Sequence, residues 1–143
     1  MQIHRIGKWT IVLLLMGCGS AKFVPLQEEG PVRIIEPYAQ RVYAGQEDGI
    51  NEMVVILPVA EHAVSVEFDS IYYQGYGTTV KKSTLSGKTV YRADINISNT
   101  GIMRRTPPYS IQKDEALLSY NLKGQTAYFK VHSIEEKEAV YMP

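Results

Sequence analysis

Alternation of apolar and polar residues is the feature of this sequence that most restricts its fold. An apolar side chain recurs at every second position in four segments, which cover residues 64–68, 91–97, 118–122 and 127–131. A period of two places these side chains on one face of an extended chain, as in a strand with one buried face. No long segment carries the period of roughly 3.6 residues that marks an amphipathic helix. The chain is therefore predicted to be all-β.

Shorter apolar runs and a turn signal extend this prediction. Met53–Leu57 is a continuous apolar run, and residues 71–73, 78–82 and 137–141 also have the composition of strands. Lys123-Gly124 separates two alternating segments and predicts a tight hairpin, because glycine accepts the positive φ angle of a two-residue turn. The last of these strands is predicted to tie the C-terminus to the edge of a sheet.

The apolar register changes inside one predicted strand. Phe68 lies at an even position, whereas Ile71 and Tyr73 lie at odd positions, so a bulge or bend is predicted near Asp69-Ser70. About seven to eight short strands with such punctuation indicate an antiparallel β-sandwich, Ig-like or related. A chain of 143 residues, 45% of them hydrophobic, suits one domain of this kind, which we expect over residues 32–143.

The N-terminal residues have a different organisation. Arg5 and Lys8 form a basic region, residues 9–16 are apolar apart from Thr10, and small residues follow. A basic region, a short apolar run and small residues, in this order, are typical of an export signal. The apolar run is too short for a permanent membrane span, which needs about 20 residues.

Leu15-Met16-Gly17-Cys18 resembles the lipobox of bacterial lipoproteins, although Met16 stands where that family usually has a small or β-branched residue. In that family a peptidase cuts before the cysteine once its sulfur carries a diacylglyceryl group. The resemblance implies a signal peptide over residues 1–17 and lipidation, including palmitate, at Cys18. It also implies a place in the cell envelope, at the periplasmic or surface face of the outer membrane. Cys18 is the single cysteine, so no internal disulfide is possible.

Residues 18–31 are predicted to be the lipidated cysteine followed by a flexible tether, since they show no period and contain Pro25, Gly30 and Pro31. Fully extended, such a tether would reach about 40 Å. From Cys18 onward the chain has 13 basic and 15 acidic residues, a formal charge of −2. Acyl chains rather than charge must then hold it at the membrane. No nucleic-acid partner is expected, because the chain lacks an excess of basic residues.

Four further segments are similar to small lipoproteins of Bacteroidota, namely Phe68–Gly75, Ser119–Gly124, Ala127–Val131 and Ala139–Pro143. The similarity runs from about Ala44 to the end of the chain and consists of strands and turns. That family has no assigned activity. The resemblance therefore implies a location and a fold, and it transfers no functional residue.

Several motifs of common enzymes and metal sites are absent from the sequence. It contains no HExxH or G-x-S-x-G motif, no phosphate-binding loop and no calcium loop. After Cys18 the only histidines are His62 and His132, and Glu61-His62 is a possible acid–base pair. We therefore predict no catalytic residue, no metal and no cofactor, and we expect a protein that is not an enzyme. A hydrolase with a site assembled from loops remains an alternative.

Two features favour a binding role. Tyrosine dominates the aromatic residues, with ten against three phenylalanines, and Tyr72, Tyr73 and Tyr76 are close in sequence. Neighbouring residues of a strand face opposite sides, so one of Tyr72 and Tyr73 should be exposed. Exposed tyrosines stack on sugars and contact proteins at low entropic cost.

The second feature is the predicted loop over residues 99–113. Loops of this length are uncommon and are often functional, and methionine, arginine and tyrosine are enriched at interfaces. We expect a lipid-anchored, non-enzymatic interaction or structural module that binds an envelope protein. The alternative partner is a carbohydrate such as peptidoglycan, bound through exposed tyrosines. The candidate partner-binding residues are Tyr73, Tyr76, Met103, Arg104, Arg105 and Tyr109.

Overall fold

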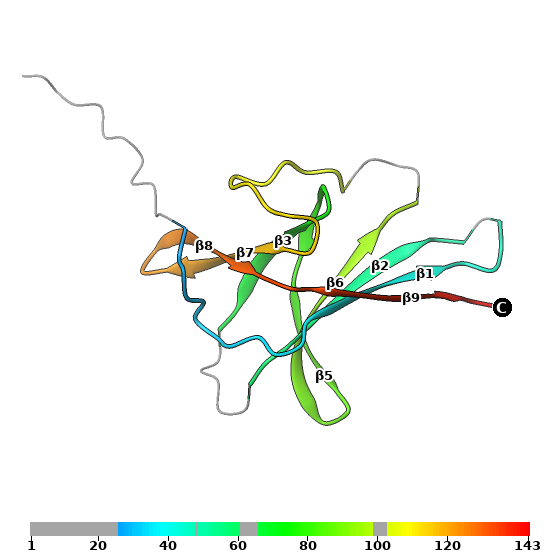
Figure 1. Ribbon diagram of the computed structural model, residues 1–143, viewed down its shortest axis with the longest axis horizontal. Coiled ribbons are helices and arrows are strands. Elements are labelled where there is room, and N and C mark those ends of the chain that lie inside the picture. The colour runs from blue at the N-terminus through cyan, green and yellow to red at the C-terminus, as the bar shows by residue number, and fades with distance from the viewer. Residues whose placement is uncertain (1–25, 48, 61–65, 99–102) are drawn as a thin grey trace, which may run out of the picture.

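The computed structural model describes residues 26–47, 49–60, 66–98 and 103–143. Within these residues it forms nine strands and no helix, arranged as two sheets (Figure 1). The predicted all-β sandwich is confirmed, with more strands than the sequence indicated. The described residues include no helix long and apolar enough to cross a membrane. The strands are β1 Tyr38–Tyr43, β2 Glu52–Pro58, β3 Phe68–Tyr73, β4 Tyr76–Thr79, β5 Lys81–Leu85, β6 Lys88–Asn96, β7 Ala116–Leu122, β8 Gln125–Val131 and β9 Glu135–Tyr141.

The sheets differ in size and in strand direction. The five-strand sheet has the order β5-β6-β2-β1-β9, and the four-strand sheet has the order β4-β3-β7-β8. All neighbouring strands are antiparallel except β1 and β9, which run parallel. The strand predicted over residues 78–82 is divided at Val80, because β4 belongs to one sheet and β5 to the other. The C-terminal strand, β9, lies at a sheet edge as predicted.

Aromatic side chains from both sheets form the centre of the core. The ring of Phe68 lies 4.6 Å from that of Tyr91 on β6, measured between centroids. It also lies 5.5 Å from Phe129 and 6.0 Å from Tyr120. All four side chains are buried, so Phe68 on the four-strand sheet connects the two layers.

The predicted bulge is present at the start of β3. Phe68 pairs with Tyr120, but Ser70 pairs with Ser119, so one extra residue of β3 is inserted between the two pairs. The hydroxyl oxygens of Ser70 and Ser119 are 2.6 Å apart, and the Ser70 N–H donates to the Ser119 hydroxyl at 3.1 Å. In the described part of the alternating segment 64–68, no strand starts before Phe68. Residues 61–65 lie outside the described residues, and β3 starts at Phe68.

Three hairpins share one kind of turn. The two central residues of each have positive φ angles, which is the geometry of a type I′ turn. The predicted Lys123-Gly124 turn joins β7 to β8, with φ angles of 51° and 81°. Gln74-Gly75 and Ser86-Gly87 join β3 to β4 and β5 to β6 in the same way. These turns fix the pairing register of the strands that present the candidate site.

The segment before β1 lies along β8. The Gln27 N–H donates to the Tyr128 carbonyl at 2.8 Å, and Gln27 pairs with Phe129 in a parallel bridge. A Cβ atom on Gly30 would lie 2.4 Å from the Phe129 ring, so this close approach needs glycine. The predicted free tether over residues 18–31 is therefore corrected, because residues 26–31 are held against the sandwich. Cys18 lies outside the described residues.

Candidate interaction surface

The chain between β6 and β7 is attached to the free edge of β4. The Gly77 N–H donates to the Met103 carbonyl at 2.7 Å, and the Arg105 N–H donates to the Gly75 carbonyl at 3.0 Å. Arg104 pairs with Tyr76 in an antiparallel bridge. Residues 103–105 are thus held on the edge of the four-strand sheet by one β-bridge, so the start of the described part of the predicted 99–113 loop has a defined position.

Side-chain contacts strengthen this attachment. The Arg104 guanidinium lies 4.6 Å from the centroid of the Tyr76 ring, a cation–π contact. The Met103 sulfur accepts a weak hydrogen bond from the Asn96 N–H at 3.1 Å. Met103 and Tyr76 are both half-buried against the core. Two of the candidate residues therefore act mainly in packing, while Arg104 and Arg105 are exposed.

Gly77 allows the loop to lie close to the sheet. A Cβ atom on Gly77 would lie 2.6 Å from Cγ of Arg105 and 3.4 Å from Cδ1 of Tyr72. The apolar part of the Arg105 side chain therefore packs directly over Gly77, next to the Tyr72 ring.

Three half-buried tyrosines gather on the outer face of the four-strand sheet. Tyr72 lies between the buried Ile71 and Tyr73, and Tyr128 lies between buried neighbours on β8, so both point outward. The Tyr109 ring, from the loop, lies 5.7 Å from the Tyr128 ring. Burial, and then the nearby phenols of Tyr72 and Tyr109, raise the pKa of Tyr128. Tyr72, Tyr109 and Tyr128 are called the tyrosine cluster below.

Tyr73 is not available to a partner, which corrects its prediction as a binding residue. Its side chain is 1% exposed and its hydroxyl accepts a hydrogen bond from Nε2 of Gln74 at 3.1 Å. Burial is the main cause that raises the pKa of Tyr73. The bulge explains the difference, because it aligns Tyr73 with the inward-facing Ile71 and turns Tyr72 outward. The change in apolar register between Phe68 and Ile71 is the sequence signal that indicates this orientation of the two tyrosines.

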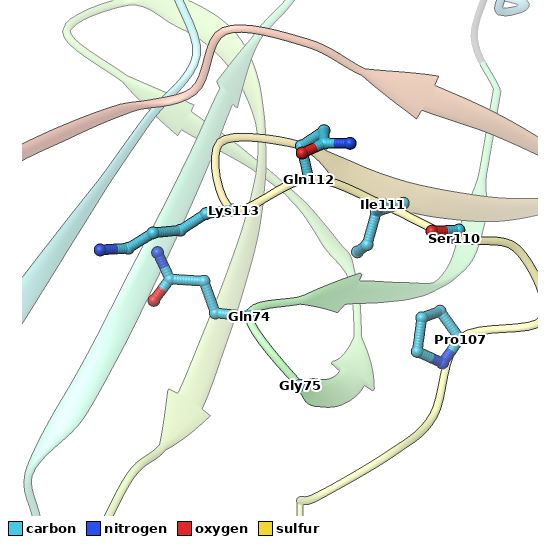
Figure 2. Close-up of a pocket in the computed structure, with 7 residues that line it drawn as sticks. All are labelled: Gln74, Gly75, Pro107, Ser110, Ile111, Gln112 and Lys113. Carbon is cyan, nitrogen blue, oxygen red and sulfur yellow. The ribbon is translucent and has the colours of Figure 1, made fainter.

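A small cavity lies between the β3–β4 turn and the loop. It has a volume of about 440 Å³, and Figure 2 shows Gln74 and Lys113 side by side at one end. The lining includes no imidazole and no carboxylate, and Figure 2 shows the Lys113 side chain directed toward Gln74 and away from the Ser110 hydroxyl. The cavity therefore offers hydrogen bonds and one cation to a ligand. Its lining residues are Gln74, Gly75, Pro107, Ser110, Ile111, Gln112 and Lys113.

One carboxylate–imidazole pair is present beside the cavity. Oε2 of Glu115 lies 2.5 Å from Nδ1 of His132, and Oε1 accepts a hydrogen bond from the Gln112 N–H at 2.8 Å. The Gln112 N–H, followed by the His132 contact, lowers the pKa of the buried Glu115 carboxyl against the effect of burial. Among the described residues, no serine, threonine or cysteine side chain hydrogen-bonds to His132. The pair therefore serves to join two strands, and the predicted Glu61-His62 pair lies outside the described residues.

Comparison with known proteins does not assign a role to this surface. No protein-family model, no curated protein and no solved structure matches the chain. In the ranges that the structure describes, no three His, Cys, Asp or Glu residues are placed to bind a metal ion. The candidate site is therefore the surface formed by residues 103–113 and the tyrosine cluster.

Proposed function

We propose that this protein is a lipid-anchored lipoprotein of the bacterial cell envelope that acts as a non-enzymatic interaction module. The observation that carries the proposal is Leu15-Met16-Gly17-Cys18, placed after a basic region and a short apolar run. The contact of residues 26–31 with β8 supports a sandwich held close to the membrane. The chain from Cys18 to Leu26 spans at most about 28 Å when fully extended.

We also infer that the sandwich is Ig-like. Strands β5, β6, β2 and β1 lie in the order expected for strands D, E, B and A of such a domain. Strands β3, β7 and β8 have the order of strands C, F and G in the opposite sheet. Modules of this kind commonly bind through the loops and faces that the strands hold in place. The strand order is therefore compatible with an interaction role.

Replacing Cys18 with alanine should abolish acylation and release the domain from the membrane. The reason is that acyl chains on Cys18 supply the anchoring free energy, about 0.8 kcal/mol for each buried methylene group. Intact-mass spectrometry and membrane fractionation measure the two effects, with Ser20→Ala as the matched control. An unmodified thiol at Cys18 in the wild-type protein would contradict the proposal.

The surface formed by residues 103–113 and the tyrosine cluster is the proposed contact site for an envelope protein. Arg104 and Arg105 are exposed on this surface, and Tyr109 is half-buried. Arginine and tyrosine together supply hydrogen bonds and large rigid contact areas. Because backbone hydrogen bonds hold residues 103–105 on β4, little conformational entropy is lost on binding.

A glycan is the second candidate partner, and the tyrosine cluster favours it. Half-buried aromatic rings present apolar faces for sugars while their hydroxyls stay within reach of solvent. The three rings come from β3, β8 and the loop, so they share one face without a large rearrangement.

Tyr109→Ala should weaken partner binding at least about tenfold, because it removes the ring that the loop contributes to the cluster. A photo-crosslinker at the exposed Thr106 should capture an envelope protein in cells, whereas one at the exposed Thr126 should not. Binding to purified peptidoglycan tests the glycan candidate. The matched control for Tyr109→Ala is Tyr141→Ala, since Tyr141 is 75% exposed and stacks on Tyr43, outside the tyrosine cluster. Equal binding by the two alanine variants would exclude this surface.

A further inference from the structure

Strand β5 presents an open sheet edge. It is the first strand of the five-strand sheet, and all five of its residues are exposed. Among the described residues, no segment pairs with its outer edge. Such an edge displays unpaired N–H and C=O groups that another extended chain can use.

The other three sheet edges are either paired with another segment or negatively charged. Residues 103–105 pair with β4, and Gln27 pairs with β8. The remaining edge strand, β9, has the sequence Glu-Glu-Lys-Glu at its start, so its negative charges discourage an acidic chain. Strand β5 is therefore the edge best suited to accept an acidic segment.

The β5–β6 hairpin concentrates positive charge. Residues 81–93 contain four basic residues and no acidic residue, although the chain from Cys18 onward has a formal charge of −2. Arg92 forms an ion pair with Asp94 at 2.9 Å. Lys81 is exposed at the start of β5, and Lys88 is exposed directly after the β5–β6 turn. These charges complement carboxylates on an approaching strand.

The register of the hairpin indicates which backbone groups face the open edge. Leu85 and Lys88 flank the two-residue turn, so they form a hydrogen-bonded pair, as do Ser83 and Val90 two positions further along. Thr84 lies between these pairs, so its N–H and C=O point away from β6. Thr84 thus offers its backbone N–H and C=O to an added strand.

An apolar surface lies next to this edge. The hairpin forms one wall of a groove of about 1180 Å³, and Ile35, Val59 and Val90 contribute apolar lining. Leu85 belongs to β5, lines the same groove and is 44% exposed. An apolar side chain of an added strand would therefore cover Leu85 as well as pair with the backbone.

Charge and position identify the occupant. A second copy would bring the same lysines against Lys81 and Lys88, which is unfavourable. Residues 1–25 of this chain contain no Asp or Glu to complement the lysines. In Figure 1 the tip of the β5–β6 hairpin lies apart from the blue start of the described chain, which favours a protein over the anchoring membrane.

We propose that β5 is a docking edge for an extended, acidic segment of a partner protein, which adds to the five-strand sheet as a further strand. Backbone hydrogen bonds to Thr84 provide affinity. Lys81 and Leu85 share one face of β5, so they select an acidic and an apolar side chain on that face of the added strand, and Lys88, paired with Leu85, adds positive charge there. This deepens the proposed interaction role and rests on it. The site is separate from the tyrosine cluster and does not depend on the lipid anchor.

The proposal can be tested with a displayed library of random peptides, each long enough to form a strand of roughly six residues. The target is the full protein, purified in a mild detergent from the cells that express it. Selection should enrich peptides with several acidic residues and no proline. Synthetic copies should bind with a Kd of the order of 10–100 μM and more weakly at high salt. Enrichment of neutral or basic peptides, or of none, would overturn the proposal.

Two matched pairs of variants then locate the binding. Thr84→Pro removes the outward-facing backbone N–H and should weaken peptide binding at least about tenfold. Thr84→Ala keeps this N–H and should change the peptide affinity less than about twofold. Lys88→Glu should weaken binding about fivefold, and Lys123→Glu, within the β7–β8 turn of the other sheet, should not. Equal binding within both pairs would overturn the proposal. So would a preference for anionic over neutral vesicles that Lys88→Glu abolishes while the peptides stay unbound. Intact-mass spectrometry of the same preparation reports acylation, so failure of the anchor is recognised separately.

Discussion

Phe68→Ala should lower the free energy of unfolding by about 3–5 kcal/mol, the loss typical of removing a large buried aromatic side chain. Phe68 contacts the rings of Tyr91, Tyr120 and Phe129, so its removal leaves a cavity between strands of both sheets. The surrounding rings cannot fill this space without leaving their own packing positions. Urea denaturation followed by circular dichroism measures the change.

An exposed leucine provides the control for this experiment. Leu122, at the end of β7, is exposed, and Leu122→Ala should cost less than about 1 kcal/mol. If Phe68→Ala cost as little as Leu122→Ala, the aromatic cluster would not be the centre of the core.

Glu115→Ala should lower the free energy of unfolding by about 2–3 kcal/mol at neutral pH. The buried carboxylate accepts hydrogen bonds from the Gln112 N–H and from Nδ1 of His132, and the substitution leaves the Gln112 N–H without this acceptor. The loss should be largest at neutral pH, where the carboxyl is ionised. Thermal and chemical denaturation at neutral pH measure it, with the exposed Glu47→Ala as the control.

The same carboxyl predicts how stability depends on pH. The native structure lowers the pKa of Glu115 below its ordinary value of 4.5, so the native state binds this proton less readily than the unfolded state does. The resulting stabilisation is complete above the ordinary pKa and is lost as the pH falls through the lower native pKa. The difference in stability between wild type and Glu115→Gln should therefore shrink on acidification. A difference that stays constant between neutral pH and about pH 3 would contradict this assignment.

Local rules predicted several elements correctly because each depends on neighbouring residues alone. The turn at Lys123-Gly124 follows from the φ angles that glycine tolerates, and its register places Glu115 opposite His132. The bulge near Asp69-Ser70 follows from the change in apolar parity around it. The all-β class follows from the period-two alternation.

Other elements could not be predicted from neighbouring residues. Strand β1 (Tyr38–Tyr43) shows no clear alternation because most of its residues are half-buried on both faces. The division of residues 78–82 between two sheets depends on which strands lie beside them, and Val80 itself carries no local signal of this. The pairing of Arg104 with Tyr76 joins residues that are 28 positions apart in the chain.

The amino-acid sequence by itself determined the all-β class, the turn and bulge positions and the prediction of a lipidated Cys18. These depend on backbone preferences, on side-chain period and on a short signal that is read before folding. The tertiary structure alone decided that Tyr73 is buried, that Tyr72, Tyr109 and Tyr128 share a face, and that no described segment pairs with the outer edge of β5. The physical reason is that strand partners are chosen by the packing of the whole core, so distant residues meet only once both sheets have formed.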